Sequence, residues 1–106
     1  SLGSDFLGTI KILNGEIFLH GSDQQWNEFL GYDAETITKK PFLNFVAPTH
    51  LEVAQETIKN ILDGKNVQDI ALDLISSTGD ITSIEFSALV KGKALFWFAS
   101  NSSVLA

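Results

Sequence analysis

Few side chains in this chain could carry out nucleophilic, acid–base or metal chemistry. It has two histidines, His20 and His50, thirteen acidic residues and no cysteine. Without cysteine there is no disulfide, no thiolate nucleophile and no cysteine-ligated metal. No serine–histidine–acid grouping can be assembled around the two histidines, and no glycine-rich phosphate loop is present. The sequence therefore predicts no catalytic residue.

The histidines and the acidic pair Asp69 and Asp73 fit structural roles instead. His20 is expected at the end of a strand, with no second imidazole or cysteine to share a metal ion. His50 is expected to be an exposed residue at the start of a helix. The two aspartates alternate with apolar residues and are expected to face solvent, where nothing tunes a carboxylate for catalysis. No metal site is predicted.

Composition and charge exclude several classes of partner. The chain has 106 residues, a net charge of −6 and seven basic residues, all of them lysine. Scattered lysines in an acidic chain do not predict binding to nucleic acid or to an anionic membrane surface. The longest apolar stretch, 94–99, is far too short for a bilayer span. Cytoplasmic localisation is expected, in keeping with the lack of cysteine.

The length fits one domain over residues 1–106. The chain has no methionine, so it is expected to be cut from a longer protein. Residues 1–7 are expected to be a flexible or cloning-derived start, and 101–106 a truncated linker.

The elements that must position these residues begin with a hairpin. Residues 8–13 and 16–20 flank Asn14-Gly15, which tolerates positive φ at both turn positions and so predicts a tight β-hairpin. Ser22, with Gln25 three residues later, predicts the capped start of a helix.

Helical signals fill the middle third. Asp33 predicts the cap of a short helical turn, and the segment 41–48 is an apolar connector between two prolines. Thr49 and Glu52 form a second capping box, which predicts a helix over 49–62. The expected apolar face of this helix consists of Leu51, Ala54, Ile58 and Ile61.

The last third changes to alternating apolar and polar residues, which predicts three antiparallel strands over 68–75, 81–90 and 94–100. The order is β-β-α-α-α-β-β-β. Since neither layer can bury its apolar side alone, the sequence predicts an α+β fold in which helices cover one face of a five-stranded antiparallel sheet. A pocket between the long helix and the sheet is expected.

This order and these turn residues resemble the PAS family over residues 8–100. In that family a helix ends in Leu-Gly-Tyr, a short helix follows, and an apolar run closes on a proline. Ser77-Thr78-Gly79 stands where the family has a Lys-Asp-Gly turn, and 81–88 resembles the strand after it. The family's Asp-Ile-Thr at the end of the last strand is replaced by 101–103. The matching positions in the middle segment are Trp26, Leu30, Gly31, Tyr32, Phe42, Leu43, Phe45, Val46 and Pro48.

The resemblance implies a sensory module joined to an output domain such as a histidine kinase, a cyclic-nucleotide enzyme or a chemoreceptor. It also implies homodimerisation, commonly through the outer sheet face or flanking helices. In haem-binding members the iron-ligating histidine lies within the long helix, about where this chain has Gln55. Photosensing flavin members need a cysteine. Neither haem nor cysteinyl-flavin chemistry is therefore expected, and the cofactor is left open.

The many aromatic residues predict a packed core more strongly than a cofactor site. Ligand pockets are themselves mostly apolar, so a pocket remains open as an alternative, with Gln55 as its polar anchor. Its expected lining is Phe45, Leu51, Ala54, Gln55, Ile58, Leu72, Leu74, Phe86 and Phe96.

Three functions remain in view. The first is a sensory module that binds a small ligand or a partner in the helix–sheet cleft. The second is a ligand-free dimerisation or protein-interaction domain with the same fold. The third, more remote, is a small α+β enzyme of the ketosteroid-isomerase type, although such folds usually lead with long helices.

Overall fold

The chain starts with the predicted β-hairpin. In the computed structural model, which describes residues 5–21 and 23–102, β1 (Asp5–Leu13) pairs antiparallel with β2 (Glu16–His20). Asn14 and Gly15 have φ of 53° and 76°, as a tight turn of this kind requires. β1 begins before the predicted Gly8 because residues 5–9 also pair with the last strand. Residues 5–7, which belong to the start expected to be flexible or cloning-derived, are therefore part of the sheet.

The middle third is a chain of short helices, as predicted. The Asp33 carboxylate accepts a hydrogen bond from the Thr36 amide at 2.8 Å and caps the second helix. The predicted cap Ser22 lies outside the described residues, as does the side chain of Gln25. The elements are α1 (Asp23–Leu30), α2 (Ala34–Lys39), the 3-10 turns η1 (Phe42–Phe45) and η2 (Pro48–His50), and α3 (Leu51–Leu62).

The start of α3 differs from the prediction. The capping box at Thr49 is wrong, because α3 begins at Leu51 with no side-chain cap. Its first turn grows directly out of η2, where the His50 amide donates to the Ala47 carbonyl at 2.9 Å. The carbonyls at this 3-10 turn therefore accept hydrogen bonds from amides that a side-chain cap would otherwise satisfy.

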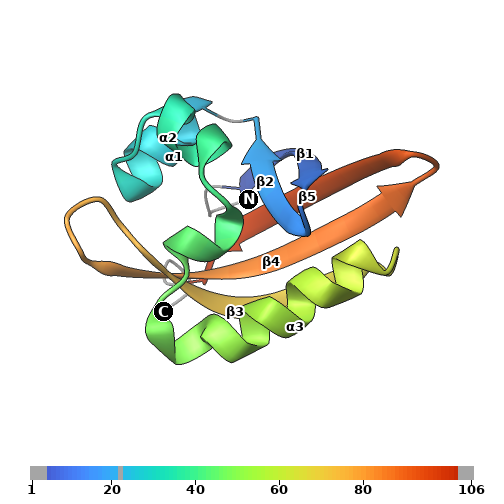
Figure 1. Cartoon of the computed structure of the whole chain (residues 1–106). Coiled ribbons are helices and arrows are strands. Elements are labelled where there is room, and N and C mark those ends of the chain that lie inside the picture. Colours follow the sequence, from blue (N-terminus) through green and yellow to red (C-terminus); the bar gives the residue numbers. More distant parts are fainter. Residues whose placement is uncertain (1–4, 22, 103–106) are drawn as a thin grey trace.

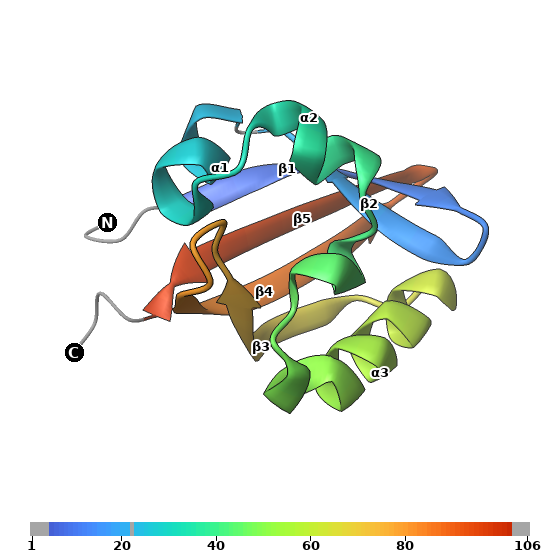
Figure 2. The ribbon, with the colours of Figure 1, turned by 60° about the vertical axis from the view of Figure 1, so that its left-hand side comes forward.

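The last third forms the three predicted antiparallel strands, β3 (Val67–Ile75), β4 (Ile81–Lys91) and β5 (Ala94–Asn101). The sheet order is β2-β1-β5-β4-β3, so β5 joins the hairpin to the other two strands (Figure 1). The helices lie on one face of the curved sheet, with α2 against β2 and α3 beside β3 (Figure 2). The predicted α+β fold is confirmed.

A bulge in β3 keeps its apolar residues on the inner face. Val67 and Ile70 both contact the core, although they are three positions apart and strict alternation would place them on opposite faces. The register shifts between them, and Asp69 adopts a φ of 52° there, with its amide bonded to the Ser87 hydroxyl at 2.9 Å. The extra residue turns the strand so that both side chains point inward.

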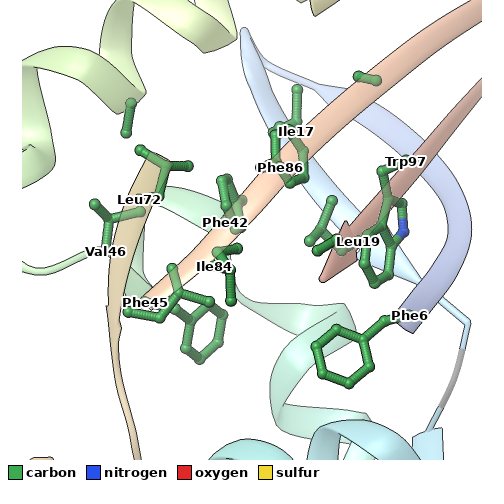
Figure 3. Packing of buried hydrophobic residues seen from close by; sticks show 14 of the residues in the cluster. Phe6, Ile17, Leu19, Phe42, Phe45, Val46, Leu72, Ile84, Phe86 and Trp97 are labelled. Atoms are coloured by element: carbon green, nitrogen blue, oxygen red, sulfur yellow. The ribbon is translucent and has the colours of Figure 1, made fainter. Parts of the chain in front are cut away.

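Aromatic rings fill the space between the helices and the sheet (Figure 3). Phe42 stacks on Phe86 with centroids 5.0 Å apart, and Phe86 lies 6.4 Å from Trp97. Trp97 stacks on Trp26 at 5.3 Å, and Trp26 on Phe6 at 5.5 Å. This row of rings connects η1, β4, β5, α1 and β1, so it holds the helical layer to the sheet.

Gly8 makes room for one of these rings. A Cβ at this position would lie 1.7 Å from the His20 carbonyl oxygen and 2.9 Å from Trp97 Nε1. With no side chain there, the Trp97 indole donates a hydrogen bond to His20 O at 3.1 Å. The glycine therefore allows the buried indole to be satisfied where β1 passes between β2 and β5.

Candidate functional site

Over the part of the chain that the structure describes, apolar side chains pack the space between helices and sheet. One void within this packing offers no room for a water molecule. Trp26 is one of the residues that line this void, and its Nε1 atom is buried without a hydrogen-bond partner among the described residues. The void is lined by Leu19, Trp26, Ile37, Phe42, Phe45 and Leu74.

The predicted pocket residues are distributed over three places. Gln55 and Ile58 line a groove outside the core, and Phe96 lies on the opposite face of the sheet. Leu51 is partly buried against the core. The others are packed inside it, namely Phe45, Ala54, Leu72, Leu74 and Phe86. Whether any of them binds a ligand stays a prediction.

The inward placement of Phe96 was wrong. Phe96 is 39% exposed, whereas the next residue, Trp97, is 1% exposed. Successive strand residues point to opposite faces, and Trp97 lies opposite Ala88, whose side chain belongs to the core. Ala88 and Phe86 share the inward parity of β4 and pair with Trp97 and Ala99, so the register with β4 determines which face Phe96 occupies.

A groove of about 310 Å³ runs between the β1–β2 hairpin and α3, which we call the hairpin groove. Ile17, on its floor, is buried, and the remaining apolar lining comes from Pro41, η1 and α3. Gln55 and Lys59 stand on the α3 wall and Glu16 on the hairpin wall. The full lining is Gly15, Glu16, Ile17, Pro41, Leu43, Gln55, Ile58, Lys59 and Leu62.

Four exposed apolar side chains meet on the outer face of the sheet, and we call them the outer patch. They are Leu7, Leu89, Phe96 and Phe98, with exposed fractions of 67%, 36%, 39% and 43%. Leu7 lies directly opposite Phe98, and Phe96 directly opposite Leu89. A depression of about 480 Å³ lies over β1 and β5 at this place.

His50 and Asp73 join the start of α3 to β3. His50 Nδ1 accepts a hydrogen bond from the Asp73 amide at 3.2 Å and lies 3.6 Å from the Asp73 carboxylate. That carboxylate also accepts from the Ser83 hydroxyl at 2.6 Å. Both side chains are more than two-thirds buried, so the expected exposure of His50 and of Asp73 was wrong. In this grouping the acid stands between the serine and the histidine, which is not the order of a hydrolytic triad.

Tyr32 anchors the segment between α1 and α2 to the far end of β3. Its hydroxyl donates to the Ile75 carbonyl at 2.8 Å, and its ring packs edge-on against Phe45. Partial burial raises the pKa of the Tyr32 phenol, since the phenolate is poorly solvated there. The Ser77 amide bonds the Leu30 carbonyl at 2.8 Å beside it. The Leu-Gly-Tyr motif and the Ser-Thr-Gly turn are therefore in direct contact.

The described residues set two further limits on the site. Among them, no three histidine, aspartate or glutamate side chains gather as a metal site would need. None of the helices in the part of the chain described is long and apolar enough to cross a membrane.

Comparison with known proteins matches the fold but not the sequence. No protein-family model and no curated protein sequence matches the chain. The PAS domain of a protein from Colwellia psychrerythraea superposes with a TM-score of 0.68 at 16% identity, over 92% of this chain and 85% of the other.

Two further solved structures carry bound small molecules. A variant of the Cycle PAS-B domain from Drosophila melanogaster, with bound glycerol, gives a TM-score of 0.68 at 12% identity, covering 92% and 96% of the two chains. The PAS domain of the quorum-sensing receptor RpfR from Cronobacter turicensis, in complex with BDSF, gives 0.66 at 10% identity, covering 96% and 95%. With its hairpin, its run of short helices and its three closing strands in this order, the chain has the fold of a PAS domain.

Proposed function

We propose that this chain is a regulatory module of a larger signal-transduction protein, and that it associates with a second copy of itself through the outer patch. The observation that carries this proposal is the pair of phenylalanines on β5, Phe96 and Phe98. They are 39% and 43% exposed on the outer face of the sheet. Exposed aromatic residues gathered in one patch are typical of protein contact surfaces.

The distribution of charge makes the outer patch the place where a second copy can approach. The chain carries a net charge of −6, so two copies repel each other over most of their surfaces. The outer patch and its neighbours Thr9 and Ser87 bear no charge, while Lys11 and Glu85 flank it on adjoining strands. Two copies can therefore approach at this face without burying an unpaired charge.

The proposal is tested by equilibrium sedimentation of the wild type, Phe98→Lys and Ile81→Lys. Phe98→Lys places a charge at the centre of the patch and is expected to weaken the dimer by about 100-fold or more. Ile81 is 56% exposed but lies outside the patch, so Ile81→Lys is the matched control and is expected to leave the dimer intact. A monomeric wild type, or a Phe98→Lys dimer as tight as the wild type, would contradict the proposal.

The resemblance to PAS domains supports an output domain joined covalently to the module, such as a histidine kinase of a two-component system, in the cytoplasm. In such a protein a change in packing at the dimer face alters the geometry of the attached domains. A ligand can drive that change only through different affinities for the two packing states. The ketosteroid-isomerase alternative is not proposed, because it requires another fold.

Small-molecule sensing is the second candidate function, and the hairpin groove is the observation that favours it. The groove measures about 310 Å³, within the usual range for small-molecule sites, whereas the interior void has no room for a water molecule. Two solved structures of the same fold hold small molecules, glycerol and BDSF, and this supports small-molecule sensing. Native mass spectrometry with a thermal-shift screen tests it, and the lack of any bound or stabilising compound would count against it.

A further inference from the structure

We propose that the hairpin groove binds a small uncharged molecule with an apolar body of about ten non-hydrogen atoms and one hydrogen-bonding group that meets Gln55. This inference rests on the second candidate function, small-molecule sensing, and names its ligand class. It does not depend on association through the outer patch, which lies on the other face of the sheet.

The size of the groove limits the ligand. Water occupies about 30 Å³ per molecule in the liquid, so a space of about 310 Å³ corresponds to about ten such volumes. That space suits a chain or ring system of about ten heavy atoms. It is too short for a helix or strand of another protein, because its wall on α3 spans only about two turns, from Gln55 to Leu62.

The lining determines the polarity of the ligand body. Ile17 is 1% exposed at the floor, and Leu43 and Ile58 are partly buried beside it. Leu62 continues this surface at the end of α3 and is 38% exposed. An apolar body that covers these side chains removes apolar surface from water on both partners, which drives binding.

The charges of the groove favour a neutral ligand. Lys59 on the α3 wall and Glu16 on the hairpin wall balance each other, so the lining carries no net charge. Both side chains are exposed, and an exposed charge attracts an ionised ligand only weakly through solvent. A carboxylate or ammonium would still lose part of its hydration on entering, and would meet a like charge on one wall. An uncharged group avoids both costs.

Gln55 supplies the matching neutral contact. It stands one helical turn before Lys59 on the same wall, and its side chain makes no hydrogen bond to any other described residue. Its amide offers one acceptor and two donors, so it suits a hydroxyl, amide or carbonyl group equally.

The test uses three probes that share one eight-carbon chain: octan-1-ol, octanoate and octylamine, which is cationic at pH 7. Amide shifts of the full chain in ¹H–¹⁵N NMR locate each probe and give its Kd. Octan-1-ol is expected to shift residues 15–17 and 55–62 and to bind about fivefold or more tighter than either ion. Tighter binding of octanoate or octylamine would overturn the ligand class, as would octan-1-ol shifts confined to the outer patch.

Two variants sharpen the result. Gln55→Leu is expected to weaken octan-1-ol binding about threefold to tenfold, because the hydroxyl loses its partner, while Gln24→Leu on the exposed surface of α1 is the matched control. Lys59→Gln leaves Glu16 unbalanced and is expected to strengthen octylamine binding and weaken octanoate binding. An unchanged order of the three probes in Lys59→Gln would overturn the charge argument. If none of the probes binds at the groove, the small-molecule function itself fails, whereas binding with the wrong order rejects only the ligand class.

Discussion

The two faces of β5 carry similar side chains in opposite surroundings. On the inner face Trp97 is 1% exposed, stacked between other rings and bonded to a backbone carbonyl. On the outer face Phe96 and Phe98 remain about two-fifths exposed. An aromatic residue in this strand therefore contributes to folding on one face and remains available for association on the other. The difference depends only on the parity of the residue in the strand.

The largest expected effect compares the two faces directly. Trp97→Ala removes a buried ring and its hydrogen bond, and we expect it to lower the free energy of unfolding by about 3–5 kcal/mol. Phe98→Ala, the matched change on the outer face, is expected to change it by less than about 1 kcal/mol in the monomer. Urea denaturation at low protein concentration measures both. Equal losses for the two variants would remove the distinction between the faces.

The next effect tests how the inner ring is accommodated. Gly8→Ala places a methyl group against the His20 carbonyl and the Trp97 indole, and we expect a loss of about 1–3 kcal/mol or more from this overpacking. Thr9→Ala, one residue along on the outer face, serves as the control and is expected to have little effect. Thermal unfolding followed by tryptophan fluorescence reports both changes. A stable Gly8→Ala protein with wild-type fluorescence would show that β1 can move away at no cost.

A smaller effect is expected where the helical layer meets the edge strand β3. His50→Ala removes the acceptor for the Asp73 amide and is expected to cost about 1 kcal/mol. Thr49→Ala is the informative companion, since the sequence predicts a helix cap at Thr49 and the structure has none. We expect Thr49→Ala to be nearly neutral in chemical denaturation. A larger loss of stability in Thr49→Ala than in His50→Ala would indicate that Thr49 caps the helix as the sequence predicts.

The smallest effect is spectroscopic. Tyr32 is the single tyrosine of the chain, so tyrosinate absorbance reports it alone. Because its folded pKa is raised, its contribution to stability is complete below the unfolded value of about 10 and is lost as pH rises through the folded pKa. We expect its titration midpoint in the native protein to lie above that in urea. Coincident midpoints would mean that the phenol is as well solvated in the folded protein as in the unfolded chain.

Local signals in the sequence predicted the elements well. Asn14-Gly15 indicated the hairpin, Asp33 the cap of α2, and the alternating residues of the last third the three long strands, because each depends on neighbours in the chain. Together they determined the order of elements and hence the fold. The limits appeared where a feature depends on distant contacts.

The candidate sites depended on such contacts. The orientation of Phe96 follows from its register with β4, and the inward turn of Val67 from a bulge at Asp69. Whether a cleft is open depends on how rings from separate elements fill it, and the stacking of Phe42 on Phe86 is one such contact between distant segments. The hairpin groove exists because a turn and a helix far apart in the chain approach each other, which no local pattern of residues encodes.

The pairing of β1 with β5 also places the start of the first strand beside the end of the last, with Asp5 opposite Ser100. A short peptide could therefore join these ends, and the chain could be reopened at the Asn14-Gly15 turn with its elements still in register. The same proximity means that the chain enters and leaves the sheet through one pair of neighbouring strands.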